Sequence, residues 1–131
     1  MSDTVVYDAG ALLAAERNDR RFLVRHRRLV QHEDRLLVPA PVLAQVWRCG
    51  RRQVMLSRML RACDVVTTTE TVARSAGVLL ASSGTSDAVD AIVVATALAE
   101  RAVLVATSGP DDIELLFGDP AIHVKPGLLV V

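Results

Sequence analysis

Carboxylates stand at the ends of two of the most apolar stretches of this chain. Asp8 closes the run that begins at Val5, and Asp90 opens the run from Ala91 to Ala97. Burial of an ionised carboxylate without compensation costs on the order of several kcal/mol. Each of these acids therefore needs a cation, a helix N-terminus or another hydrogen-bond donor beside it, and both are candidates for a functional site.

Three further acids are placed where they can join this pair. Asp87 lies three residues before Asp90 and shares one face of a predicted helix with it. Asp111 and Asp112 follow the fourth predicted strand. Ligands of parallel α/β proteins gather outside the carboxyl ends of the strands, so these side chains can converge on one rim. Clustered carboxylates repel one another unless a cation is present, and oxygen ligands suit Mg²⁺ or Mn²⁺ better than zinc.

Helix capping is an alternative explanation for most of these acids. An Asp at a helix N-terminus stabilises the helix by about 0.3–1 kcal/mol, which alone accounts for Asp87, Asp90, Asp111 and Asp112. Asp8 is harder to explain in this way because it follows a strand directly and precedes Ala-Gly-Ala.

The elements that must position these acids alternate between short apolar runs and longer helical patterns. This alternation predicts an α/β fold with a central parallel sheet and helices on both faces. The predicted strands are residues 5–7, 36–38, 65–67, 103–106 and either 122–124 or 128–130. The predicted helices are residues 9–18, 22–31, 42–48, 51–62, 70–81, 88–100 and 110–117, with Val54, Met55, Leu56, Met59 and Leu60 pointing inward from the fourth of them.

The length and composition indicate one domain over residues 1–131, because 51% of the residues are hydrophobic and no linker or repeat divides the chain. The longest apolar run falls far short of the roughly 20 residues that span a bilayer. The N-terminus carries acids in place of an apolar signal segment, so we expect a cytoplasmic protein. Cys49 and Cys63 lack metal-ligand spacing and are expected to be reduced thiols. His26, His32 and His123 form no nucleophilic triad with Ser or Cys.

The net charge is zero, but the charges are unevenly distributed. Residues 1–63 hold twelve Arg and six acids, whereas residues 64–131 hold three basic residues and nine acids. This asymmetry indicates a basic surface beside an acidic site, an arrangement suited to holding a polyanion over a metal ion. Fourteen of the fifteen cations are Arg. That bias fits phosphate recognition and fits a GC-rich coding sequence equally well.

Four segments resemble, in order and in spacing, the acidic motifs of PIN domains. They are Val6–Leu12, Val38–Val46, Asp90–Ala97 and Thr107–Ile113. The resemblance covers nearly the whole chain, and the chain length is similar to that of the VapC toxins of bacterial toxin–antitoxin pairs. It implies a PIN-like fold and Mg²⁺- or Mn²⁺-dependent cleavage of RNA, with Asp8 and Asp90 as the metal-binding catalytic acids.

Two positions depart from the family pattern. Gln45 stands where PIN domains usually carry a Glu, and Gly109 stands where the fourth motif usually carries Asp or Asn. Gln offers an oxygen without a charge, so a site with this residue is expected to bind the ion more loosely or in altered geometry. The expected metal ligands are Asp8, Asp87, Asp90 and Asp112.

The sequence thus predicts an endoribonuclease toxin. It leaves open an inactive PIN-like domain that binds RNA or a protein, whereas a nucleotide switch would need a Gly-rich phosphate loop that the chain lacks. Expected partners are the RNA substrate, a small VapB-like antitoxin whose Arg or Lys enters the acidic rim, and a second copy of the chain. Trp47, at helical spacing from Leu43 and Val54, is expected to pack rather than to stack on a base, and the Arg residues are either RNA contacts or a solvated helix face. The candidate RNA contacts are Arg48, Arg51 and Arg52, with Arg58 beside them; the apolar residues that favour a homodimer are Val54, Met55, Met59 and Leu79.

Overall fold

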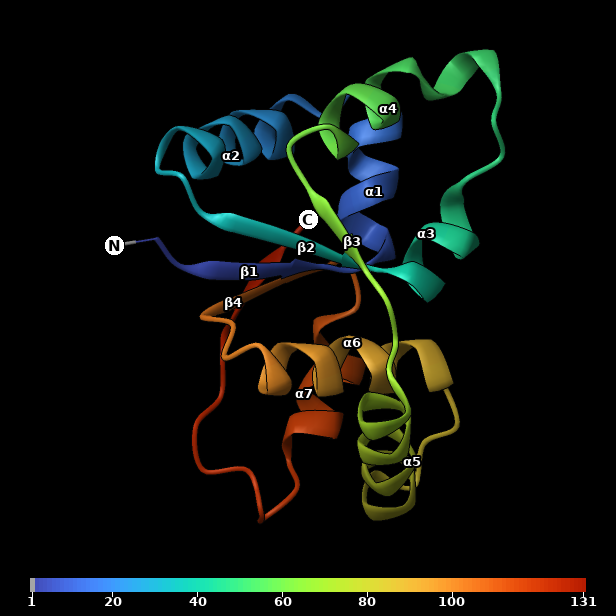
Figure 1. Cartoon of the computed structure of the whole chain (residues 1–131), viewed down its shortest axis with the longest axis vertical. Helices are drawn as coiled ribbons and strands as arrows, with labels where there is room; N and C mark the ends of the chain where they lie inside the picture. The colour runs from blue at the N-terminus through green and yellow to red at the C-terminus, as the bar shows by residue number, and fades with distance from the viewer. Residues whose placement is uncertain (1) are drawn as a thin grey trace.

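Five parallel strands form one sheet in the computed structural model, which describes residues 2–131 (Figure 1). The strand order is β3-β2-β1-β4-β5. The inner strands are almost continuously apolar and buried, as expected where helices cover both faces of a parallel sheet. The predicted fold is confirmed, and the last strand forms at the second of its two predicted places. The strands are β1 (Thr4–Tyr7), β2 (Arg35–Pro39), β3 (Asp64–Val66), β4 (Leu104–Thr107) and β5 (Gly127–Val130).

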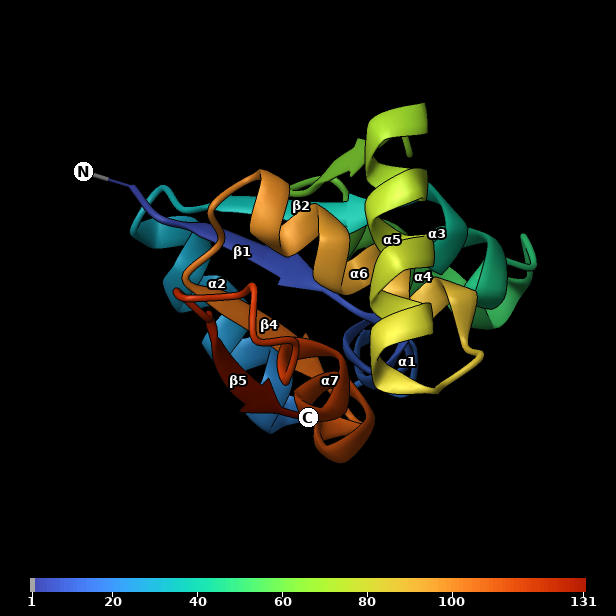
Figure 2. The same cartoon turned by 90° about the horizontal axis from the view of Figure 1, so that it is seen from below.

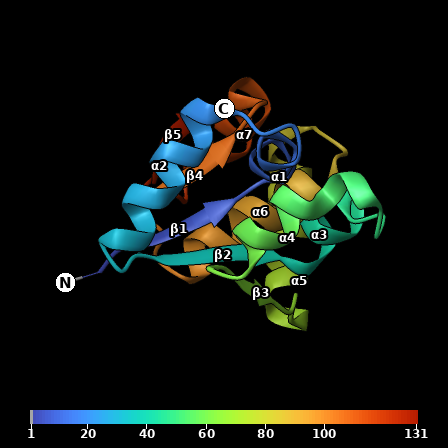
Figure 3. The same ribbon diagram turned by 90° about the horizontal axis from the view of Figure 1, so that it is seen from above.

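Helices cover both faces of this sheet. α1 (Ala9–Glu16), α2 (Arg20–Gln31) and α4 (Val54–Leu60) lie on one face, seen from above in Figure 3. α5 (Glu70–Ser83), α6 (Ala88–Ala99) and α7 (Pro110–Phe117) lie on the other face, seen from below in Figure 2. α3 (Ala40–Val46) follows β2 directly. In residues 2–131 no single helix is long and apolar enough to cross a membrane, and α5 and α6 pass that test only jointly, as a pair bent by 116°.

The segment between α3 and α4 differs from the prediction. The predicted helix 51–62 is a 3₁₀ turn, η1 (Arg51–Gln53), followed by the shorter α4. The buried side chain of Gln53 explains the break: its Nε2 donates to the carbonyl of Val46 (2.8 Å), and its Oε1 accepts from the backbone N–H of Arg48 (2.9 Å). This polar anchor ends α3 at Val46, two residues earlier than predicted.

Two packing predictions fail for the same reason. Trp47 was expected to pack at helical spacing from Leu43 and Val54, but it is the C-cap of the shortened α3, in extended conformation, and is 39% exposed. Val54 was expected to point inward, but it begins α4 and is 53% exposed. Leu56 and Met59 do point into the core as predicted.

The strand order creates a switch point between β1 and β4. The chain moves from β1 outward to β2 and β3, and then returns across the other face to place β4 on the opposite side of β1. Such a reversal opens a crevice at the carboxyl ends of the two central strands, where ligands bind in open α/β sheets. Gly10 keeps this crevice narrow, because a Cβ at this position would lie 2.6 Å from the backbone N of Ser108 in the β4–α7 loop.

Candidate metal centre

Asp8 lies at the switch point, at the carboxyl end of β1. It is the N-cap of α1 and is only 7% exposed. Its Oδ1 accepts a hydrogen bond from the backbone N–H of Ala9 (2.6 Å), and its Oδ2 accepts one from the hydroxyl of Thr107 (2.8 Å). These two donors compensate for the loss of water around a buried carboxylate and fix its orientation.

Thr107 is a site residue that we did not predict from the sequence. It ends β4 and is fully buried, and its Oγ1 also accepts a hydrogen bond from the backbone N–H of Gly109 (3.0 Å). Thr107 therefore joins the ends of the two central strands to the loop that starts α7. The sequence feature that could have indicated Thr107 is its place directly after a predicted strand, within the fourth acidic motif.

Asp87 and Asp90 lie together at the start of α6, as their spacing predicted. Asp87 is the N-cap, and its Oδ1 accepts from the backbone N–H of Asp90 (3.0 Å). Burial raises the pKa of Asp90 to about 6, with further contributions from the negative charges of Asp87, Asp8 and Asp112. The capping interpretation is thus correct for Asp87 and, contrary to our expectation, also for Asp8, whose carboxylate caps α1. Capping does not explain why three other acids act on Asp90.

Asp112 reaches the same place from α7. It lines a hollow of about 290 Å³ with Asp87 and Asp90, whereas Asp111 in the same helical turn does not line it. Ser86 and Leu116 are among the other lining residues. The other three predicted ligands, Asp8, Asp87 and Asp112, are therefore close enough to raise the pKa of Asp90, and Asp112 rather than Asp111 faces the hollow.

The carboxylates fit a hard divalent cation that keeps part of its water. Within residues 2–131 no three His, Cys, Asp or Glu side chains are already arranged as a ready set of metal ligands. Mg²⁺ commonly binds through one or two carboxylates and retains several waters, so a preformed cage is not needed. The candidate ligands offer only oxygen atoms. A bound cation would offset the repulsion between the Asp90 carboxylate and its three acidic neighbours, which contributes to the raised pKa of Asp90.

Gln45 and the predicted RNA contacts lie on or after α3, which packs against α6. The side chain of Gln45 is exposed. Arg48 is turned back onto its own helix, where its guanidinium donates to the carbonyls of Trp47 (2.7 Å), Gln45 (3.1 Å) and Ala44 (3.3 Å). Arg51 and Arg52 are exposed in η1.

Comparisons with known proteins agree with the fold. A family model described as PIN domain matches residues 5–115. Among solved structures, a chain of the crystal structure of VapBC2 from Rickettsia felis, bound to a DNA fragment from their promoter, has a similar fold, with a TM-score of 0.72. Its sequence is 14% identical, and the match covers 94% of this chain and 98% of that one. Comparison with curated proteins gives no significant match.

Proposed function

Since this chain belongs to the PIN domain family, we propose that it is a metal-dependent endoribonuclease that hydrolyses RNA phosphodiester bonds. The observation that carries this proposal is the convergence of Asp87, Asp8 and Asp112 on Asp90, whose pKa is raised to about 6. Such a concentration of negative charge at a switch point is unfavourable in the free protein and favourable around a cation. A strongly perturbed carboxylate in a hollow is typical of functional sites.

The four acids would share the work as follows. Asp8, held rigidly by Thr107 and Ala9, and Asp90 would provide the principal oxygens for Mg²⁺ or Mn²⁺, and Asp87 and Asp112 would add charge from the hollow. When bound, the ion supplies neutralisation of the scissile phosphate and activation of the attacking water. The Asp90 carboxylate binds a proton below about pH 6. A cation beside it would lower this pKa and so favour release of the proton.

The alternative is a PIN-like domain without catalysis that binds RNA or a protein. Gln45 favours it, because α3 brings an exposed amide and no carboxylate to the second motif. The absence of a ready three-ligand set among residues 2–131 points the same way. Retention of Asp8, Asp87 and Asp90 opposes it.

We also propose a VapB-like antitoxin as the partner of this chain. The similar fold in a complex named VapBC2 supports this partner, and the acidic hollow is suited to an Arg or Lys side chain.

A homodimer has weaker support than the sequence indicated, because Met59 and Leu79 are buried in the core, although Val54 and Val78 are exposed. Co-purification with the product of a neighbouring gene tests the antitoxin. Light scattering tests the dimer, and a 14.1 kDa monomer at high concentration would contradict it.

Cleavage assays on two variants test the enzymatic proposal. Asp87→Asn removes one charge from the hollow, and we expect RNA cleavage and Mn²⁺ affinity to fall at least about tenfold, or ~1.4 kcal/mol. Gln45→Glu adds the missing carboxylate and should leave activity equal or higher. If the wild type cleaves no RNA and Gln45→Glu alone creates cleavage, the binding-module alternative is right. If neither protein cleaves RNA or binds Mn²⁺, the acids act only as helix caps.

A further inference from the structure

Helix α2 carries the densest group of cations on the molecule. Five of its twelve residues are exposed Arg, whereas Phe22 and His26 anchor the helix to the core. None of the five takes part in an ion pair among residues 2–131, where the ion pairs involve other residues. They are Arg20, Arg21, Arg25, Arg27 and Arg28.

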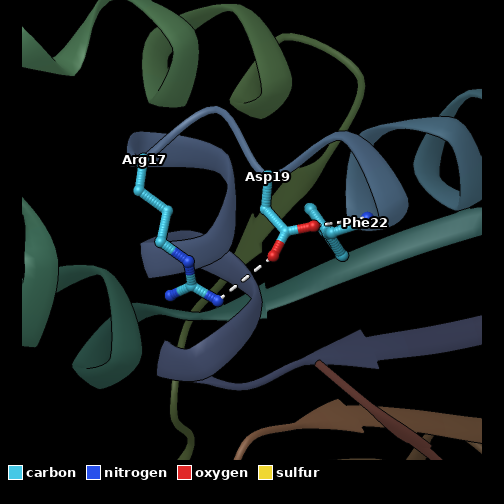
Figure 4. Close-up of polar contacts among 3 residues, drawn as sticks. All are labelled: Arg17, Asp19 and Phe22. Carbon is cyan, nitrogen blue, oxygen red and sulfur yellow. Dashed lines mark hydrogen bonds and ion pairs between the residues drawn. The ribbon is translucent and has the colours of Figure 1, made fainter.

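Some of these positions are unfavourable for the helix itself. Arg20 and Arg21 lie in the first turn, at the positive end of the helix dipole, where cations destabilise. Arg21 and Arg25 are like charges one turn apart, which also weakens a helix. Asp19 offsets part of this: its Oδ1 accepts from the backbone N–H of Phe22 (3.1 Å), and its Oδ2 pairs with Arg17 (3.4 Å) (Figure 4). A bound polyanion would offset the remaining destabilisation of α2 by its cations.

One side of α2 presents these cations as a row. Arg21, Arg25 and Arg28 follow an i, i+4, i+7 pattern, which places them on one side of the helix with axial separations of about 6 and 4.5 Å. Arg25 and Arg28 line a hollow of about 370 Å³. Its remaining walls are Leu29 of α2, Leu104 of β4 and Leu129 of β5, so the row lies beside the β4–β5 side of the sheet (Figure 3).

The end of this row at Arg28 lies toward the end of the strands that is opposite the acidic site. The turn that follows α2 leads into β2 and lies beside the amino end of β1, because Asp34 Oδ1 in this turn accepts from the backbone N–H of Asp3 (3.0 Å). Leu104 is the first residue of β4. The acids gather at the carboxyl ends of the same strands, after Tyr7 and Thr107.

We propose that Arg21, Arg25 and Arg28 form a second contact surface for the RNA substrate, which binds its phosphate backbone away from the acidic site. This inference rests on the proposed function. The exposed surface of α2 fits a phosphate backbone better than an acidic protein, because its exposed large apolar residues are Val24 and Val30, with no aromatic among them, and protein interfaces depend on buried apolar or aromatic anchors. Backbone binding needs only correctly spaced positive charge and is independent of base sequence.

Fluorescence anisotropy with a labelled 30-nucleotide single-stranded RNA tests this surface. The measurement uses the whole chain in EDTA, so that binding is observed without cleavage. We expect Arg25→Ala/Arg28→Ala to weaken binding at least fivefold and to reduce the slope of log affinity against log salt by about 1.4, since each phosphate contact in a single strand contributes about 0.7. Arg25→Lys/Arg28→Lys should retain most of the affinity. Thermal melting confirms that each variant is folded.

The matched control removes two cations elsewhere. Arg74→Ala/Lys125→Ala changes the net charge equally on other elements and should alter RNA binding less than twofold. Equal effects of the two double variants, or no RNA binding by the wild type, would overturn the proposal. Polyglutamate that binds with the same dependence on Arg25 and Arg28 would assign the surface to an acidic protein instead. If the wild type cleaves RNA and the α2 variant binds RNA as tightly as the wild type, the α2 surface is wrong and the proposed function stands. If RNA binding depends on the α2 surface but no RNA is cleaved, the surface stands and the proposed function is wrong.

Discussion

At the residue scale, Asp8 and Asp90 place the same functional group in different surroundings. Asp8 is buried and accepts hydrogen bonds from Ala9 and Thr107, which hold its side chain in one orientation. Burial of the Asp90 carboxyl, with the negative charges of three neighbouring carboxylates, raises its pKa to about 6. Two like groups with different surroundings can take different roles, one held in place by hydrogen bonds and the other able to exchange a proton.

Removal of the Thr107 hydroxyl should disturb the orientation of Asp8 without replacing any acidic residue. In Thr107→Val, Asp8 Oδ2 and the backbone N–H of Gly109 both lose a buried partner. We expect the free energy of unfolding to fall by about 1–3 kcal/mol and metal affinity to fall with it. Denaturant unfolding measures the first effect. Thr96→Val in the buried part of α6 is the control and should change stability much less; equal losses in both variants would show that the Asp8 contact is not special.

The raised pKa of Asp90 predicts a pH dependence with a definite sign. Between the ordinary value of 3.8 and about 6, the folded state holds a proton that the unfolded state has released. The free energy of unfolding therefore falls as pH rises through this window. In EDTA, Asp90→Asn should match the wild type near pH 4 and be more stable at pH 7, whereas Asp111→Asn, outside the hollow, should not show this difference. Equal stability of the wild type and Asp90→Asn at pH 7 would contradict the raised pKa of Asp90.

At the element scale, the sequence predicts most helices and strands but not the end of α3. Apolar β-branched runs and capping residues locate β1, β2, α6 and α7 closely, because local pattern and burial agree there. The break before α4 depends on Gln53, whose side chain bonds to residues five and seven positions away once it is buried. Such a tertiary hydrogen bond leaves no periodic signal, so the predicted helix 51–62 was too long and Trp47 was misplaced.

The contact between α1 and the β4–α7 loop can be tested with two glycines. Gly10→Ala places a Cβ 2.6 Å from the backbone N of Ser108 and should destabilise the protein by about 1–3 kcal/mol, because the backbone must shift. Gly77→Ala meets nothing within 4 Å in α5 and should stabilise it by about 0.5–1 kcal/mol. Thermal unfolding measures both changes. A neutral Gly10→Ala would mean that α1 and this loop are not closely packed.

At the scale of the whole molecule, the uneven charge of the sequence becomes an arrangement in space. The basic residues 1–63 form α1 to α4, which mainly cover one face, and the acidic residues 64–131 supply α5 to α7 on the other. The sequence predicted that Asp8, Asp87, Asp90 and Asp112 lie together, because their spacing could be compared with predicted strand and helix ends, and their role as metal ligands stays a prediction. It did not identify Thr107, since its bond to Asp8 joins residues 99 positions apart.

A Mn²⁺ soak of crystals of this protein tests the central claim, that its acids hold a divalent cation. We predict an anomalous peak within about 2.0–2.3 Å of a carboxylate oxygen of Asp8 or Asp90. In crystals of Asp90→Asn the peak should weaken or disappear, while the positions of α1 and α6 stay the same. A peak at another site, or no peak at millimolar Mn²⁺, would contradict the metal centre and leave the acids as helix caps.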